Sequence, residues 1–201
     1  MRELSLHILD LIENAVTAGA SRVAVEITQE TEWDLMRIVV DDNGPGLRVS
    51  AQRAMDPFYT TKEGKRTGLG LSLFRFRIEQ AGGELTLGRS KLGGLAVRAT
   101  MSLAHVDRNP LGDLAATISS VVASNSRLEL SLCIRIDGRE QVIVRSEVAR
   151  QMVATDGSAP AAHTTGVSSL NRSLAAARPF AVARQMYWKI KAGLETLQIK
   201  E

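Results

Sequence analysis

The chain has 201 residues, and its 44% hydrophobic content is enough to build the core of a globular protein. A formal net charge of +3 is too small to indicate a nucleic-acid-binding protein, and a single cysteine excludes an intrachain disulfide. There is neither a secretory signal pattern nor an apolar run long enough to span a bilayer, so we expect a cytoplasmic protein without a membrane span.

The first predicted element is an amphipathic helix that begins at Leu4. Apolar residues recur there at helical spacing, and Gly19 follows as a helix stop. The opposite flank carries a polar stripe, because side chains three or four residues apart share one face of a helix. The stripe consists of Glu3, His7, Asp10 and Asn14. Such a stripe is usually a solvated face, so by itself it indicates no function.

Two strands are predicted next, over 22–28 and 35–40, and we expect them to pair as a hairpin. The second strand runs into Asp41-Asp42-Asn43-Gly44-Pro45-Gly46, where the glycines and the proline prevent its continuation. A carboxylate is therefore presented at the end of a buried strand. The same pattern is typical of an ordinary turn in which acidic residues act as turn formers.

The remaining elements of this first domain, which we place at residues 1–103, are two helices and two strands joined by a glycine turn. They are expected over 49–55, 71–80, 84–87 and 95–103. Between the two helices lies an irregular segment, 58–70, that is rich in glycines, hydroxyls and cations.

The rest of the chain is divided into a small α+β appendage, a linker or weakly ordered segment rich in small residues, and a last helix. These parts span 104–155, 156–179 and 180–201. In the appendage, Asn109 is suited to cap a helix that has Pro110 at its first position. Alternating apolar residues over 128–136, followed by Asp137-Gly138, predict a β-hairpin.

The glycine-rich segment 64–70 lacks the Gly-Lys-Ser/Thr ending of a P-loop and the third glycine of a dinucleotide fingerprint. Small residues at Gly68 and Gly70 would still let backbone N–H groups approach a phosphate. The helix that follows directs its positive end at the same place. A flexible loop followed by a helix cap is an equally good interpretation of this segment alone.

Three short motifs occur in a fixed order, and together they are more specific than any one of them. They are Leu11-Ile12-Glu13-Asn14-Ala15, Asp42-Asn43-Gly44-Pro45-Gly46 and Thr67-Gly68-Leu69-Gly70-Leu71. The combination resembles the asparagine box and the two glycine boxes of the GHKL superfamily, the ATPase domains of gyrase, the heat-shock chaperone, mismatch-repair and histidine kinase proteins. The resemblance covers about residues 1–103. It implies an α+β fold, a Bergerat-type α/β sandwich with helices on one face of a mixed sheet.

The resemblance implies ATP and Mg²⁺ as cofactors and assigns roles to the motif residues. Asp42 would accept a hydrogen bond from the adenine amino group, and Asn14 would hold Mg²⁺ through its amide oxygen. Asp10, one helical turn before Asn14, would be the catalytic base, and its competence is open because related members have a longer glutamate there. Further nucleotide-binding residues implied by the resemblance are Gly44, Gly46, Lys62, Lys65, Arg66, Thr67, Gly68, Leu69 and Gly70. For each of the cations, a solvated loop position is an equally good interpretation.

The sequence also departs from the pattern of the superfamily. Gly93-Gly94 stands where a glycine-threonine pair often precedes the last strand, so a hydroxyl contact to the nucleotide is expected to be missing. The sequence begins directly at the asparagine-box helix, without a dimerising hairpin that carries a phosphoacceptor histidine. We therefore do not expect a self-phosphorylating histidine kinase.

These patterns predict an ATP- and Mg²⁺-binding regulator that acts as a protein kinase or an ATPase, with a non-catalytic nucleotide-sensing module as the alternative. The stretches 2–10 and 105–114 also resemble stand-alone bacterial ATP-binding proteins associated with hydrogenase and NADH-dehydrogenase-type subunits. The expected partners are ATP and a protein, with a homodimer left open. Two less favoured hypotheses are a metal site on His7, Asp10 and Asn14 and a nucleic-acid-binding protein.

Overall fold

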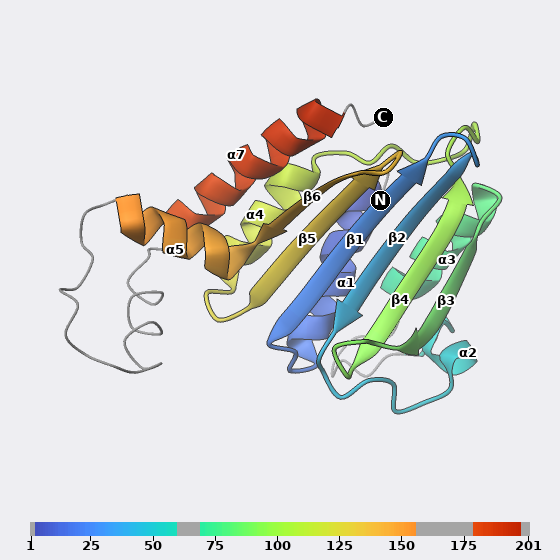
Figure 1. Cartoon of the computed structure of the whole chain (residues 1–201). Helices are drawn as coiled ribbons and strands as arrows, with labels where there is room; N and C mark the ends of the chain where they lie inside the picture. Colours follow the sequence, from blue (N-terminus) through green and yellow to red (C-terminus); the bar gives the residue numbers. More distant parts are fainter. Residues whose placement is uncertain (1–2, 60–68, 156–178, 198–201) are drawn as a thin grey trace.

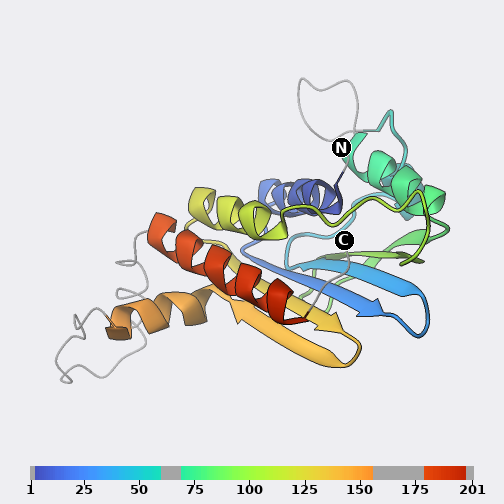
Figure 2. The ribbon, with the colours of Figure 1, turned by 90° about the horizontal axis from the view of Figure 1, so that it is seen from above.

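The computed structural model describes residues 3–59, 69–155 and 179–197, which build a six-stranded mixed sheet with helices on one side (Figures 1 and 2). The strand order is β3-β4-β2-β1-β5-β6. The elements are α1 (Leu4–Thr17), β1 (Arg22–Glu30), β2 (Leu35–Asp42), α2 (Ala51–Ala54), α3 (Leu69–Gln80), β3 (Glu84–Arg89), β4 (Leu95–Ser102), α4 (Leu114–Ser124), β5 (Glu129–Ile136), β6 (Arg139–Val144), α5 (Arg145–Thr155) and α7 (Pro179–Leu197). The chain is thus of the α+β class, as predicted, with the layers of a Bergerat-type sandwich.

The core lies between the sheet and the helices α1, α3, α4 and α7, which share one side of the sheet in Figure 2. Strands β2 and β5, and β1 up to Ile27, alternate buried and more exposed residues, so their apolar side chains face these helices. The helices meet them with apolar residues at four-residue steps. Examples are Leu4, Ile8 and Ile12 on α1, Leu114, Ile118 and Val122 on α4, and Val182, Met186 and Ile190 on α7, each at most 1% exposed.

The C-terminal segment adds to the same sheet. Strand β5 pairs in parallel with β1, from Arg22 opposite Glu129 to Gln29 opposite Ile136, and β6 pairs antiparallel with β5. The predicted hairpin is therefore confirmed. Helix α7 packs along α4, and both lie over the side of the sheet that contains β5 and β6 (Figure 1). The division of the chain into four parts stays a prediction. Those parts are 1–103, 104–155, 156–179 and 180–201, and residues 156–178 lie outside the described residues.

The predicted cap at Asn109 is wrong. Helix α4 begins only at Leu114, and Asp113 caps it by accepting a 2.8 Å hydrogen bond from the Ala116 N–H. The connector before it has another task, because the carbonyls of Pro110 and Leu111 accept 2.9 Å hydrogen bonds from the N–H groups of Leu4 and Ser5. These are donors in the first turn of α1, which have no partner within the helix.

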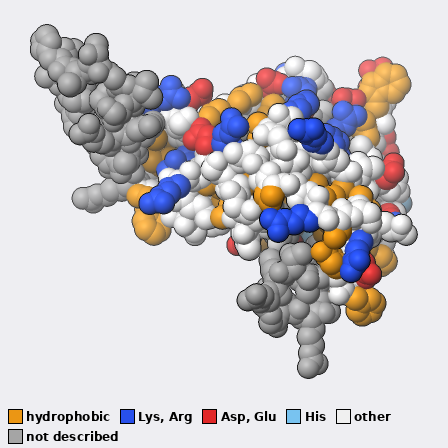
Figure 3. Space-filling model, turned by 90° about the horizontal axis from the view of Figure 1, so that it is seen from below, with side chains coloured by type: hydrophobic (Ala, Val, Ile, Leu, Met, Phe, Trp, Pro, Cys, Tyr) orange, Lys and Arg blue, Asp and Glu red, His pale blue; other side chains and the backbone are white. Residues whose placement is uncertain are grey.

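Smaller differences concern element ends. Strand β2 includes Asp41 and Asp42, α2 covers only Ala51–Ala54, and α3 begins two residues earlier than predicted. Helix α5 was not predicted. Within the described residues, no helix combines the length and hydropathy that a membrane-spanning segment needs. On the face shown in Figure 3, lysine and arginine side chains lie among acidic and apolar ones.

Candidate functional site

Asp42 lies at the end of β2 with its side chain directed toward the helix layer and is 8% exposed. Its Oδ1 accepts hydrogen bonds from the N–H groups of Gly44 (2.7 Å) and Leu95 (3.2 Å). Its backbone carbonyl accepts a third bond, of 3.0 Å, from the N–H of Gly94. The neighbouring Asp41 points to the other face of the sheet, because side chains alternate along a strand. The carboxylate of Asp42 is thus held in one orientation.

The surroundings of Asp42 require glycine at two positions, one in the β3–β4 turn and one in the turn after β2. A Cβ on Gly94 would lie 2.1 Å from Asp42 Oδ1, so a side chain there would displace the carboxylate. Gly46 has a φ of +71°, a backbone conformation that glycine adopts without strain. After Gly93-Gly94, where the sequence departs from the superfamily pattern, Leu95 supplies its backbone N–H to Asp42.

Asn43 was not assigned a role from the sequence, yet its amide is fully engaged with the turn after α1. Its Oδ1 accepts hydrogen bonds from the N–H groups of Ser21 (2.9 Å) and Arg22 (2.8 Å), and its Nδ2 donates to Ser21 Oγ (3.0 Å). Asparagine in a turn commonly bonds nearby backbone, which is the one sequence signal that could have indicated such a role. Here the partners lie 21 and 22 residues away, so the signal did not identify them.

The polar residues of α1 lie on one face of the helix, as predicted, and this face is directed toward α3. Asn14 Nδ2 donates a 3.2 Å hydrogen bond to Asp10 Oδ2. The same carboxylate lies against Gly70 in the first turn of α3, where a Cβ would come within 1.8 Å of Asp10 Oδ2. Glycine at position 70 therefore lets the start of α3 approach α1 closely.

His7 occupies the same face of α1 but is buried, at 1% exposed. Its ring stacks on Phe74 of α3, with 5.0 Å between centroids and 21° between planes. Neither ring nitrogen has a hydrogen-bond partner among the described residues. Burial lowers the pKa of His7 to about 4, because the imidazolium would lose its hydration, so the ring is neutral at pH 7. In this structure His7 serves helix packing.

The structure brings the predicted residues together in two groups. Asp42, Gly44 and Gly46 form the turn beside Gly94, and Asp10 and Asn14 lie beside Gly70. The two groups are connected through the end of α1, since a Cβ on Gly44 would lie 3.6 Å from the Cβ of Ala20. Leu69 begins α3 and is 54% exposed. The other predicted residues, Lys62, Lys65, Arg66, Thr67 and Gly68, lie outside the described residues.

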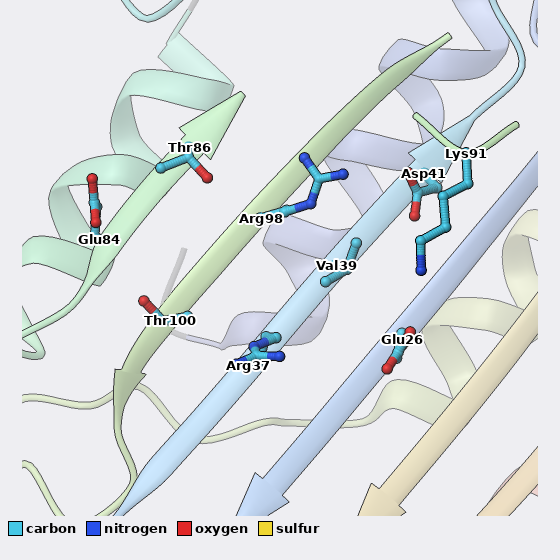
Figure 4. A pocket seen from close by; sticks show the side chains of 9 residues that line it. All are labelled: Glu26, Arg37, Val39, Asp41, Glu84, Thr86, Lys91, Arg98 and Thr100. Carbon is cyan, nitrogen blue, oxygen red and sulfur yellow. The ribbon is translucent and has the colours of Figure 1, made fainter. Parts of the chain in front are cut away.

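A cavity of about 320 Å³ lies on the open face of the sheet, away from the helices (Figure 4). Side chains of both charges from four strands and the β3–β4 turn surround it. They are Glu26, Arg37, Val39, Asp41, Glu84, Thr86, Lys91, Arg98 and Thr100. Because Asp41 lines this cavity while Asp42 faces the helices, the cavity and the candidate site lie on opposite faces of the sheet.

The layered α+β sheet is that of an ATPase domain of the GHKL class. Residues 2–105, more than half of the chain, match the family described as "Histidine kinase-, DNA gyrase B-, and HSP90-like ATPase", and the chain belongs to this family.

Similar proteins include bacterial sensor kinases. The chain is 36% identical over 104 residues to the two-component sensor PprA of Pseudomonas aeruginosa, a match that covers 47% of this chain and 11% of that protein. It is 34% identical over 105 residues to the sensor protein kinase CarS of the same organism, covering 51% and 23%. The chain therefore spans less than a quarter of the length of these relatives.

Similar solved structures include the catalytic domain of histidine kinase ThkA, with 28% identity and a TM-score of 0.42 over 51% of this chain and 68% of that one. Another is the Aquifex aeolicus MutL ATPase domain complexed with ADP, with 14% identity and a TM-score of 0.38 over 72% and 63%.

Proposed function

We propose that the chain binds ATP with Mg²⁺ and acts as a cytoplasmic regulator that phosphorylates a partner protein or hydrolyses ATP. One observation carries this proposal: Asp42 is fixed at the helix side of the sheet by Gly44 and Leu95, while α1 presents Asp10 and Asn14 beside the start of α3. Membership of the ATPase family supports it.

In this proposal Asp42 recognises the adenine base. A carboxylate is acceptor-only, so it suits the exocyclic amino group of adenine, which is a donor. The two N–H groups on Oδ1 orient the carboxylate before a base arrives, which lowers the ordering cost of binding. Gly44 and Gly46 keep the turn free of side chains next to this carboxylate.

Asn14 is suited to hold Mg²⁺, because amide oxygens are ligands that this cation accepts. Its amide nitrogen donates to Asp10, so the amide oxygen is the atom that would coordinate the cation. When bound, the cation would offset phosphate charge. Gly68, Leu69, Gly70 and Thr67, together with Lys62, Lys65 and Arg66, complete the proposed phosphate contacts.

Asp10 is the proposed general base. Its carboxylate lies between Asn14 and Gly70, close to the positive end of α3. It would take the proton from a water or from a partner's hydroxyl as that oxygen attacks the γ-phosphorus and the bond to ADP breaks. An aspartate reaches less far than a glutamate, so the nucleophile would have to approach closely.

The second candidate is a nucleotide-sensing module without turnover, associated with a protein partner such as a redox complex of the hydrogenase or NADH-dehydrogenase type. It is favoured by the short reach of Asp10 and by the hydrogen bond that already engages Asp10 Oδ2. A homodimer is compatible with either candidate.

A calorimetric titration with ATP and Mg²⁺ tests the site. We expect wild-type protein to bind, Asp42→Ala to bind at least about tenfold more weakly and Asn14→Ala to lose the contribution of Mg²⁺. Wild-type protein that ignores ATP, or an Asp42→Ala variant that binds normally, would contradict the proposal. Incubation with radiolabelled ATP and a cell extract then separates the candidates, since a labelled partner band excludes the pure sensor.

A further inference from the structure

Asn43 connects the two sides of the proposed nucleotide site. It follows Asp42 directly in the chain, and its side chain binds the turn at the end of α1, the helix that carries Asp10 and Asn14. The side chain uses both functional groups: the oxygen accepts from two backbone N–H groups and the nitrogen donates to Ser21 Oγ. The backbone N–H of Asn43 adds a bond of 3.2 Å to the carbonyl of Arg22.

These four bonds all go to two residues, Ser21, which directly precedes β1, and Arg22, the first residue of β1. Strands β1 and β2 are already paired up to Val23 opposite Asp42. The amide of Asn43 extends this connection beyond the last strand pair, at the place where β2 leaves the sheet. It therefore limits how far the turn that carries Asp42 can move away from α1.

We infer that Asn43 is a positioning residue for Asp42: its amide fixes the turn so that the carboxylate meets the adenine amino group while α1 faces the phosphates. The inference rests on the proposed function, in which Asp42 recognises adenine. Asn43 itself touches no nucleotide in this assignment and acts only through Asp42 and the end of α1.

The test compares ATP with purine riboside triphosphate, an analogue that lacks only the exocyclic amino group. Both are titrated in the presence of Mg²⁺ into the full chain. A hydrogen bond to a charged group gives a wild-type preference for ATP of about tenfold or more. A variant that is merely less stable binds both nucleotides less well, whereas a variant with a displaced Asp42 loses the preference itself.

We expect Asn43→Ala to reduce the preference for ATP to about the level of Asp42→Ala, and Asn43→Asp to retain it. The aspartate keeps an oxygen for the N–H groups of Ser21 and Arg22, and its added charge opposes both triphosphates equally. Thr31→Val is the matched control, because it removes a 2.9 Å hydrogen bond to Asp137 at the opposite end of β1. We expect this control to retain the preference.

The outcomes separate the two proposals. A wild-type protein without preference, or an Asp42→Ala variant that keeps it, contradicts the proposed function. If both behave as expected while folded Asn43→Ala keeps the preference, or Asn43→Asp loses it, only the role of Asn43 is overturned. Should Asn43→Ala fail to fold, Asn43→Gln replaces it. The side-chain amide of glutamine is displaced by one methylene. If Asn43→Gln keeps the wild-type preference for ATP, the inference is overturned.

Discussion

The carboxylate of Asp10 lies directly against the Cα of Gly70, so that even a methyl group on Gly70 would overlap Asp10 Oδ2. This contact joins the helix of the asparagine box to α3, the helix that begins within the second glycine box. It explains in steric terms why a glycine stands in the first turn of α3, where that helix packs on α1.

Replacing Gly70 with alanine should therefore destabilise the protein, although alanine normally favours a helix by about 1 kcal/mol over glycine. We expect a loss of about 1–3 kcal/mol from overpacking, together with weaker ATP binding. Denaturant unfolding and an ATP titration measure the two effects. Ser72→Ala on the same helix serves as the control, and an increase in stability for Gly70→Ala would show that the contact is not tight.

The Asp10→Asn variant examines the proposed base. Asparagine keeps the size of the side chain but cannot accept a proton, so phosphate transfer or hydrolysis should fall by at least about a hundredfold. The affinity for ATP should stay nearly unchanged. Turnover assays measure the rate of phosphate transfer or hydrolysis, and calorimetry measures the affinity for ATP. If the variant keeps both at the wild-type level, Asp10 is not the base.

Gly94→Ala should disturb Asp42, because the added Cβ would lie 2.1 Å from Asp42 Oδ1 and 2.6 Å from the N–H nitrogen of Gly44. We expect ATP affinity to fall by about tenfold or more as the carboxylate is displaced. Gly93→Ala is a matched control, since it meets no atom within 4 Å and adds only backbone strain at a φ of +109°. Equal loss of affinity in both variants would contradict this explanation.

Stability should depend on pH through His7. Its pKa is lowered from 6.5 to about 4 in the folded chain, so the unfolded chain binds more protons between these values and stability falls as the pH falls through this window. Between pH 7 and pH 5 the loss amounts to about 2 kcal/mol. His7→Phe, which keeps a ring on Phe74, should remove this part of the pH dependence. Denaturant unfolding of both proteins at the two pH values measures it, and identical pH dependence would contradict the assignment.

Strand β5 should be needed for folding of the whole chain. Ile134 of β5 is fully buried and pairs with Ile27 of β1, so Ile134→Asp would place a charge in the core. We expect a loss of at least about 3 kcal/mol, visible as a lowered unfolding midpoint. Ser131→Asp, at a partly exposed position of the same strand, is the control. A well-folded Ile134→Asp protein would show that β5 is dispensable.

The periodic parts of the fold were predictable because burial repeats along each element. The spacing from Leu4 to Val16 and the alternation of β1, β2 and β5 all reflect one buried face. The prediction that Asp10 and Asn14 share one face of a helix followed from helix geometry alone, and the structure places them on that face, joined by a 3.2 Å hydrogen bond.

What the sequence did not reveal depends on contacts between distant residues. Asn109 has the chemistry of a helix cap, but the connector that follows it accepts hydrogen bonds from the first turn of α1. Asp113 caps α4 instead. The partners of Asn43 lie across the sheet, where no local pattern indicates them. The parallel pairing of β5 with β1 likewise has no local signal, because the two strands come together only when the whole sheet assembles.

That parallel pairing has a consequence for the order in which the chain is made. Val23 of β1 lies beside Leu130 of β5, so one edge of β1 stays unpaired until residues 129–136 have been synthesised. Pairings over such a distance in sequence are slow to form. During synthesis, β1 therefore presents unpaired backbone N–H and C=O groups along this edge until β5 follows, and unpaired strand edges favour aggregation.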